Sequence, residues 1–177
     1  MPDLKYFSKK LLAWYKKNKR DLPWRKTQNP YFIWISEIML QQTTVNTVIL
    51  YYQRWIKVLP TVQDVAMARQ QRLLKLWQGL GYYNRVKNIH KAAKLVCTKY
   101  NGRIPRDPQE LIKLPGFGPY TIGAVLSIAY QQSHPLIDAN VRRVIMRILA
   151  IEEKPNRLTD QQICTFLKPI LPKKKSR

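Results

Sequence analysis

Two acidic side chains lie within apolar stretches of a sequence that contains only 10 Asp and Glu residues. Glu37 lies in the run WISEIML, and Asp138 lies in the run PLIDANV. Burial raises the pKa of a carboxyl group, and a carboxyl that keeps its proton near neutral pH can act as a general acid. A second carboxylate that stays ionised can stabilise an oxocarbenium-like sugar. The pair therefore fits the cleavage of a glycosidic bond.

Each of these carboxylates also has a purely structural interpretation. Asp138 precedes Ala139, where its side chain would cap the N-terminus of a helix. Glu37 could form a buried salt bridge with one of the many arginines of the chain. The residue types alone leave these alternatives open.

A proline- and glycine-rich turn, LPGFGP over residues 114–119, separates two apolar segments with helical periodicity. Gly116 and Gly118 permit positive φ and allow backbone N–H groups to face outward. Pro119 suits the first turn of the following helix. Outward amides and a helix N-terminus can hold a DNA phosphate. The alternative is an ordinary glycine-rich connection between two helices.

This hairpin and the segment SEIMLQQT over residues 36–43 resemble the helix-hairpin-helix (HhH-GPD) DNA glycosylases, most closely those of the MutY type. The resemblance covers nearly the whole chain from Phe7 onward. It implies an all-α helix-hairpin-helix DNA glycosylase fold, with a six-helix barrel lobe and an incomplete second helical lobe. Residues 1–24 and 135–177 would form the second lobe, and residues 25–134 the barrel, with the helix-hairpin-helix motif at about 107–130.

The resemblance also implies roles for residues near the two carboxylates. Glu37 would protonate adenine, Asp138 would stabilise or capture the sugar cation, and Asn140 would contact the catalytic centre. Tyr120 occupies the position where bifunctional members carry a Schiff-base lysine, which favours a monofunctional glycosylase. The residues that would form the phosphate-binding hairpin are Leu114, Gly116, Phe117, Gly118, Tyr120 and Thr121.

Base flipping requires side chains that fill the vacated stack and a pocket for the extruded base. By resemblance, Gln42 and Tyr82 form this wedge, and we expect Tyr82 to be exposed and Tyr83 to lie in the core. The alternative is that both tyrosines form a buried pair. The other predicted substrate contacts are Trp24 and Arg25 in the adenine pocket, Thr43 and Leu80 beside the opposite guanine, and the neighbouring Leu40 and Gln41.

Helical periodicity dominates the elements that must position these residues, and no strand or internal repeat is predicted. A polar loop is expected over 19–30, and Thr61 is the expected N-cap of a short helix. Helices are predicted over 7–15, 31–42, 44–58, 62–67, 69–78, 84–100, 107–113, 119–130, 139–150 and 160–168.

Composition favours a nucleic-acid partner and excludes several other classes. The sequence has 32 Lys and Arg residues against 10 Asp and Glu, a net charge of +22, and is 45% hydrophobic. A positive field of this strength suits a polyanion, and we expect a monomer that binds double-stranded DNA with a mismatched or damaged base. A membrane span and a signal peptide are not predicted, so the expected location is the cytoplasm, on the nucleoid in a bacterium.

The remaining metal-ligating residue types do not cluster. Cys97 and Cys164 lie in apolar helical patterns and are expected in the core, whereas His90 is expected on the surface and His134 lies near Asp138. Neither histidine has a partner at zinc-ligand spacing, so no metal site is predicted.

Family members continue past a basic segment like 171–177 with another helix and four cysteines that hold an iron–sulfur cluster. None of these is in the sequence. We therefore expect no cofactor in this chain apart from a monovalent cation at the hairpin, and we expect uncovered apolar surface on the first helix and on 139–166.

Three interpretations follow. The first is a glycosylase that removes adenine opposite 8-oxoguanine or guanine, and the second is a truncated DNA-binding protein without catalysis. The third is an endonuclease III-like glycosylase with another base specificity, against which Tyr120 and Glu37 argue together.

Overall fold

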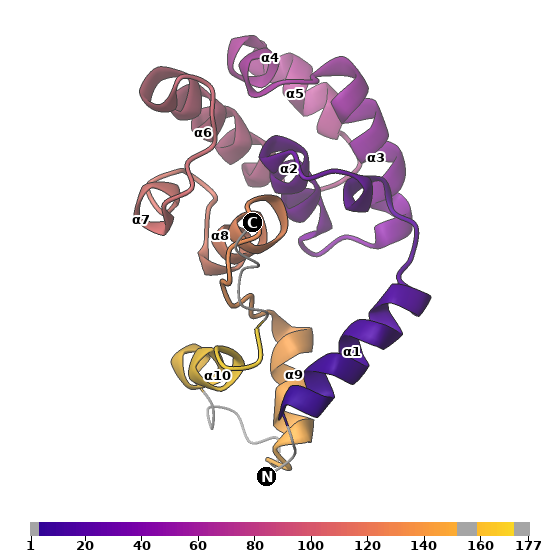
Figure 1. Ribbon diagram of the computed structural model, residues 1–177. Coiled ribbons are helices and arrows are strands. Elements are labelled where there is room, and N and C mark those ends of the chain that lie inside the picture. Colours follow the sequence, from indigo (N-terminus) through magenta and orange to yellow (C-terminus); the bar gives the residue numbers. More distant parts are fainter. Residues whose placement is uncertain (1–3, 152–158, 172–177) are drawn as a thin grey trace. The chain divides into compact units, whose positions relative to one another are not determined.

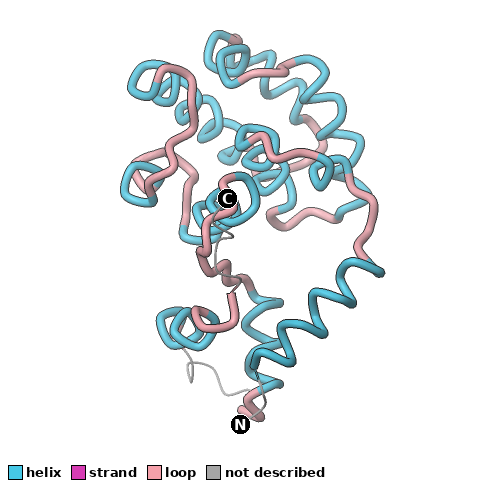
Figure 2. Tube along the Cα trace, in the orientation of Figure 1, coloured by secondary structure: helices cyan, strands magenta, loops and turns pink. Residues whose placement is uncertain are grey.

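The computed structural model describes residues 4–151 and 159–171, and these residues contain helices and loops but no strand (Figures 1 and 2). The chain forms two compact units. The central unit is Leu22–Tyr130, and the terminal unit combines Met1–Asp21 with Gln131–Arg177. The boundaries predicted from the sequence, after residues 24 and 134, lie a few residues C-terminal to the boundaries in the structure. The basic segment 172–177 lies outside the described residues.

The central unit is built around α2, whose sequence PYFIWISEIML is apolar on every side and therefore favours a buried helix. Eight of its 11 residues are buried, and it packs against η1, α3, α8 and η2. The elements of this unit are η1 (Pro23–Lys26), α2 (Pro30–Leu40), α3 (Val45–Val58), α4 (Val62–Met67), α5 (Gln70–Trp77), α6 (Asn84–Tyr100), α7 (Pro108–Leu111), α8 (Pro119–Ala124) and η2 (Val125–Ala129).

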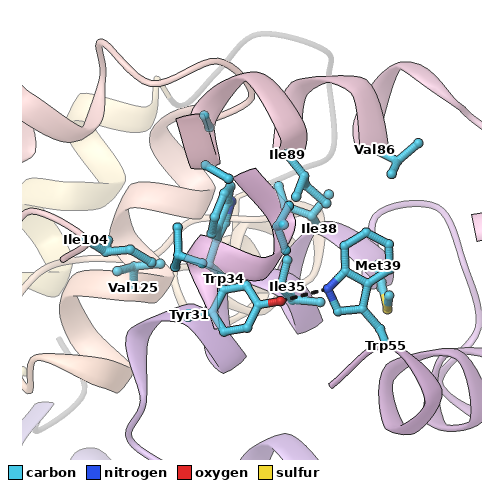
Figure 3. Close-up of a cluster of buried hydrophobic side chains, with 14 of the residues drawn as sticks. Tyr31, Trp34, Ile35, Ile38, Met39, Trp55, Val86, Ile89, Ile104 and Val125 are labelled. Atoms are coloured by element: carbon cyan, nitrogen blue, oxygen red, sulfur yellow. Dashed lines mark hydrogen bonds between the residues drawn. The ribbon is translucent and has the colours of Figure 1, made fainter. Parts of the chain in front are cut away.

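Aromatic side chains on α2 fix its neighbours. Tyr31 donates a hydrogen bond to the carbonyl of Leu59 at 2.7 Å. It accepts one from the indole of Trp55 at 2.9 Å (Figure 3). The rings of Trp34 and Phe117 lie 5.1 Å apart, which anchors the glycine-rich hairpin to α2. Glu37 is on the same helix, so the hairpin and this carboxyl share one rigid support.

Local signals in the sequence explain where most helices begin. Thr61 and Asp64 form a reciprocal capping box at the start of α4, as the Thr61 prediction requires. Asn29 caps α2 and Asp107 caps α7. Two features were not predicted: the 3₁₀ turn η1 inside the expected loop 19–30, and the π-helical turn η2 that continues α8.

The terminal unit contains α1 (Leu4–Asn18), α9 (Ala139–Ile148) and α10 (Asp160–Leu167). Its first and last described segments meet where the Ser8 hydroxyl donates to the carbonyl of Ile170 at 3.3 Å. Arg142 of α9 forms an ion pair with Asp160 of α10. Large apolar side chains are exposed on α1 and α9, in agreement with the sequence prediction: Tyr6, Leu11, Leu12, Trp14, Tyr15 and Val144.

Two burial predictions were wrong. Tyr83, expected in the core, is 43% exposed, because it is the N-cap residue of α6 and lies before Val86, the first buried residue of that helix. His90, expected on the surface, is only 7% exposed, because it shares the buried side of α6 with Val86 and Ala93 at helical spacing. Cys97 and Cys164 are both half-buried.

Candidate active site and nucleic-acid interface

Glu37 and Tyr120 form the centre of the candidate site in the central unit. Glu37 is on α2 and is 7% exposed. The Tyr120 hydroxyl, from the first turn of α8, donates a hydrogen bond to Glu37 Oε2 at 2.8 Å. The two residues are 83 positions apart in the sequence and meet because α2 and α8 pack together. A buried carboxyl held by a phenol has the fixed orientation that proton transfer needs.

Asp138 is the second predicted catalytic carboxylate, and it caps α9 in the terminal unit. Its Oδ1 accepts a hydrogen bond from the backbone N–H of Val141 at 2.7 Å, so the predicted capping role is confirmed. Its Oδ2 accepts from the side-chain amide of Asn140 at 3.1 Å. Arg143 in turn donates to Asn140 Oδ1 at 2.6 Å. This chain of hydrogen bonds fixes the orientation of the Asp138 carboxylate.

The hairpin between α7 and α8 has the geometry that the sequence predicts, with one difference. Gly116 has φ 83, a conformation that favours glycine, whereas Gly118 is extended with φ −85. Pro119 occupies the first turn of α8. Leu114 and Phe117 are buried and Thr121 is 1% exposed, while Gly116 faces solvent. The N-terminus of a helix after such a turn is a general arrangement for binding an anion through backbone N–H groups.

The predicted wedge residues lie in two separate turns of the central unit. Gln42 is exposed in the turn between α2 and α3, and Tyr82 is 62% exposed in the turn between α5 and α6. The expected exposure of Tyr82 is therefore confirmed. Both residues have positive φ, 54 for Gln42 and 45 for Tyr82. Positive φ in a residue with a Cβ is sterically unfavourable and persists only where the surroundings impose it.

Arg85, which the sequence analysis did not single out, connects these two turns. It is the second residue of α6, and its guanidinium donates to backbone carbonyls in both turns. Arg85 also shares a small pocket with Trp34 of α2 and Gly116 of the hairpin. Its hydrogen-bond acceptors are the carbonyls of Ile38 (3.0 Å), Met39 (3.2 Å), Gln41 (2.5 Å), Leu80 (2.9 Å) and Gly81 (3.3 Å) and the hydroxyl of Thr43 (3.4 Å).

The other predicted substrate contacts differ in exposure. Trp24 is 6% exposed and packs edge-on against Tyr52 at 5.4 Å, and Leu80 is 5% exposed, so both side chains belong to the core. Arg25 is exposed. Leu40, Gln41 and Thr43 are half-buried at the end of α2 and in the turn that follows. Contact of these residues with a base stays a prediction.

The described part of the chain shows neither a cluster of metal-ligating side chains nor a helix suited to a membrane. No group of three His, Cys, Asp or Glu side chains gathers there as a metal site would require. His134 accepts or donates at Nδ1 to the carbonyl of Pro135 at 3.1 Å. No helix in residues 4–151 or 159–171 is both long and apolar enough to span a bilayer.

A helical protein with a proline- and glycine-rich hairpin packed beside a buried glutamate that is hydrogen-bonded to a tyrosine is a helix-hairpin-helix protein. Residues 35–169 match the family model described as HhH-GPD superfamily base excision DNA repair protein. The chain belongs to this superfamily, and the resemblance inferred from the hairpin and the 36–43 segment is confirmed.

Similar sequences include two adenine DNA glycosylases. That of Rattus norvegicus is 44% identical over 162 residues, which cover 86% of this chain and 31% of the relative. That of Buchnera aphidicola subsp. Acyrthosiphon pisum (strain APS) is 44% identical over 146 residues, which cover 82% of this chain and 42% of the relative. The chain therefore spans less than half the length of these relatives.

Solved structures give the same fold. A thermostable thymine-DNA glycosylase matches with a TM-score of 0.86 and 29% identity, over 96% of this chain and 78% of that one. A non-covalent endonuclease III–DNA complex matches with a TM-score of 0.80 and 26% identity, over 96% and 77% of the two chains. The predicted all-α helix-hairpin-helix glycosylase fold is confirmed.

Proposed function

We propose that this chain is a monofunctional DNA glycosylase that hydrolyses the N-glycosidic bond of adenine mispaired with 8-oxoguanine or guanine in double-stranded DNA. The observation that carries the proposal is the hydrogen bond from Tyr120 to the buried Glu37. The 44% identity to adenine DNA glycosylases over most of this chain supports adenine as the substrate base.

In the proposed reaction, Glu37 transfers its proton to the adenine ring as the C1′–N9 bond breaks, and the bonding electron pair leaves with the base. The ionised Asp138 stabilises the positive charge that develops on the sugar. Water then adds to C1′, and the proton that it releases returns to Glu37. Tyr120 holds the Glu37 carboxyl in position and supplies no amine, so no Schiff base with the sugar forms.

The proposed DNA-binding surfaces lie in the central unit. We propose that the amides at Gly116, Gly118 and the first turn of α8 hold a DNA phosphate, and that Gln42 and Tyr82 fill the space of the extruded base. Residues 114–118 carry no side-chain oxygen, so a monovalent cation at the hairpin would bind backbone carbonyls. A monomer suffices for these contacts.

The proposal is tested by incubating the protein with a duplex that carries adenine opposite 8-oxoguanine and then cleaving abasic sites with alkali. We expect strand cleavage by the wild type and none by Glu37→Gln. Asp21→Asn is the matched control, because it removes an exposed carboxylate outside the proposed site, and it should cleave like the wild type.

Two outcomes would contradict the proposal in different ways. Cleavage of a duplex with thymine opposite guanine, but not of the adenine duplex, would assign another base specificity. No cleavage by a folded wild type that still binds the duplex would identify a DNA-binding protein without catalysis, which a chain covering 31% to 42% of its relatives could be.

A further inference from the structure

Arg85 makes contacts that a residue serving only the fold of α6 would not need. One terminal nitrogen, Nη1, bonds the carbonyls at the end of α2 and in the next turn, and the other, Nη2, bonds Leu80 and Gly81 before α6. Both lie 3.4 Å from the hydroxyl of Thr43. The planar guanidinium thus fits between two turns that are about 40 residues apart in sequence.

Two of the five bonded carbonyls directly precede a non-glycine residue with positive φ. Gln41 precedes Gln42, and Gly81 precedes Tyr82. Since each carbonyl belongs to the peptide unit that leads into the strained residue, fixing its direction fixes the backbone of that residue. Arg85 therefore constrains both unfavourable conformations at once.

The ring contacts connect the same groups. The guanidinium carbon lies 5.3 Å from the Tyr82 ring centroid and 5.4 Å from that of the buried Trp77. These cation–π contacts place Tyr82 against the same cation that holds the Gln42 turn. Desolvation lowers the pKa of Arg85, which is the expected sign for a cation that is partly removed from water to reach these acceptors.

We propose that Arg85 is a positioning residue that couples the two turns, so that Gln42 and Tyr82 enter the DNA as one unit rather than as two independent side chains. The inference rests on the proposed function, because that function gives these residues the role of a wedge. Arg85 touches neither the reacting atoms nor the base. A lysine keeps the charge but cannot bond two turns with one planar group.

The test measures base flipping, which can be detected without cleavage of the DNA strand. A duplex with 2-aminopurine at the target position fluoresces when that base leaves the stack, and a fluorescein label on the same duplex reports binding by anisotropy. We expect Arg85→Lys to bind the duplex nearly as well as the wild type but to lower the flipped population about tenfold. Arg54→Lys is the matched control, because Arg54 also donates to a carbonyl (Leu76, 2.7 Å) and lies over a tyrosine ring, and it should flip normally.

Double variants then distinguish coupling of the two turns by Arg85 from a purely structural role of Arg85. Gln42→Ala and Tyr82→Ala should each reduce flipping in the wild type, and neither should reduce it further in Arg85→Lys, where the wedge no longer acts as a unit. Multiplicative losses in the Arg85→Lys background would show that the side chains act independently, and unchanged flipping by Arg85→Lys would overturn the proposal outright.

Thermal unfolding shows whether Arg85→Lys is folded at the assay temperature. If it is not, Thr43→Val decides, because it removes an acceptor of both guanidinium nitrogens without touching the cation. The duplex for this variant carries an abasic site opposite 2-aminopurine, so that Thr43 has no opposite base to contact. Reduced flipping by Thr43→Val on this duplex, with binding retained, supports the coupling, and normal flipping contradicts it. Normal flipping without adenine release by the wild type would instead contradict the proposed function alone.

Discussion

Tyr120 shows how much of the proposed chemistry depends on one hydroxyl. Replacing Tyr120 with Phe keeps the ring on α8 and removes the 2.8 Å hydrogen bond to Glu37. Because hydrogen bonds to charged or titrating groups contribute about 1.5–3 kcal/mol, we expect adenine excision to slow about tenfold or more. Single-turnover kinetics measure this effect, and the duplex Kd should not change. An unchanged excision rate would remove Tyr120 from the mechanism.

His90 makes a second prediction at the scale of a residue, this time about pH. Burial, with a smaller contribution from Lys94, lowers the pKa of its imidazole below the ordinary 6.5. The unfolded chain therefore binds this proton at a higher pH than the folded protein does. Between the two pKa values the unfolded state carries more protons, so the contribution of His90 to stability is lost as pH falls below about 6.5.

We expect the thermal midpoint of the wild type to fall between about pH 7.5 and pH 5.5, and to fall less in His90→Gln. The matched control is His134→Gln, because His134 is the other histidine of the chain and is not buried. If the thermal midpoint depends on pH equally in His90→Gln and in the wild type, the pKa of His90 does not differ between the folded and unfolded states.

At the scale of an element, Asp138 combines a helix cap with a proposed catalytic charge, and two substitutions separate them. Asn caps a helix as well as Asp does, so Asp138→Asn should keep the stability of α9 and abolish adenine excision. Asp138→Ala should also lose about 1 kcal/mol of stability. Denaturant unfolding beside the cleavage assay distinguishes the two effects. Excision by Asp138→Asn at the wild-type rate would leave Asp138 as a cap only.

The hairpin offers a similar comparison between its two glycines. An alanine Cβ at Gly116 would combine φ 83 with a 3.1 Å approach to Cβ of Asn88, so Gly116→Ala should lose about 1–2 kcal/mol of stability. At Gly118 a Cβ meets nothing within 4 Å, so Gly118→Ala should fold normally. If the hairpin holds a phosphate, this added methyl weakens duplex binding severalfold, whereas unchanged affinity would contradict a phosphate at this position.

The elements were predicted well where a local signal in the sequence marks their ends. The predicted range 84–100 is that of α6, and Thr61 caps α4 as its position before an apolar run indicated. The π-helical turn η2 left no such signal, because a single turn of five residues is too short for its longer period to appear in the apolar pattern of residues 119–130. The exposure of Tyr83 depends on the turn before α6, which periodicity does not describe.

The contacts of Arg85 were not predicted from the sequence, for a related reason. A basic residue near a polar loop is typically solvated, and the carbonyls that bind it are on the backbone, which leaves no pattern of residue types. One signal was present: Arg85 shares a helical stripe with Ile89, Ala92 and Val96, all of which are buried. A cation in the core register of a helix needs acceptors, and in this chain the acceptors are the two turns that carry the proposed wedge residues.

For the whole molecule, the charge of +22 predicts how binding responds to salt. Each phosphate that the protein neutralises contributes about −0.9 to the slope of log K against log salt concentration. With several phosphates contacted, we expect a slope of about −3 or steeper in anisotropy titrations. Gly118→Ala should lower affinity at every salt concentration. A flat response would exclude phosphate contacts as the main source of affinity.

The terminal unit is assembled from both ends of the sequence, and this affects the order in which a ribosome can build the protein. Ser8 of α1 bonds the carbonyl of Ile170, 162 residues later. At about 5–20 residues per second, α1 waits on the order of ten seconds or more for that partner. Glu37 and Tyr120 can meet earlier, so the proton donor of the proposed site matures during synthesis. The apolar side of α1, where Trp14 is 61% exposed, is a surface that chaperones can hold during this delay.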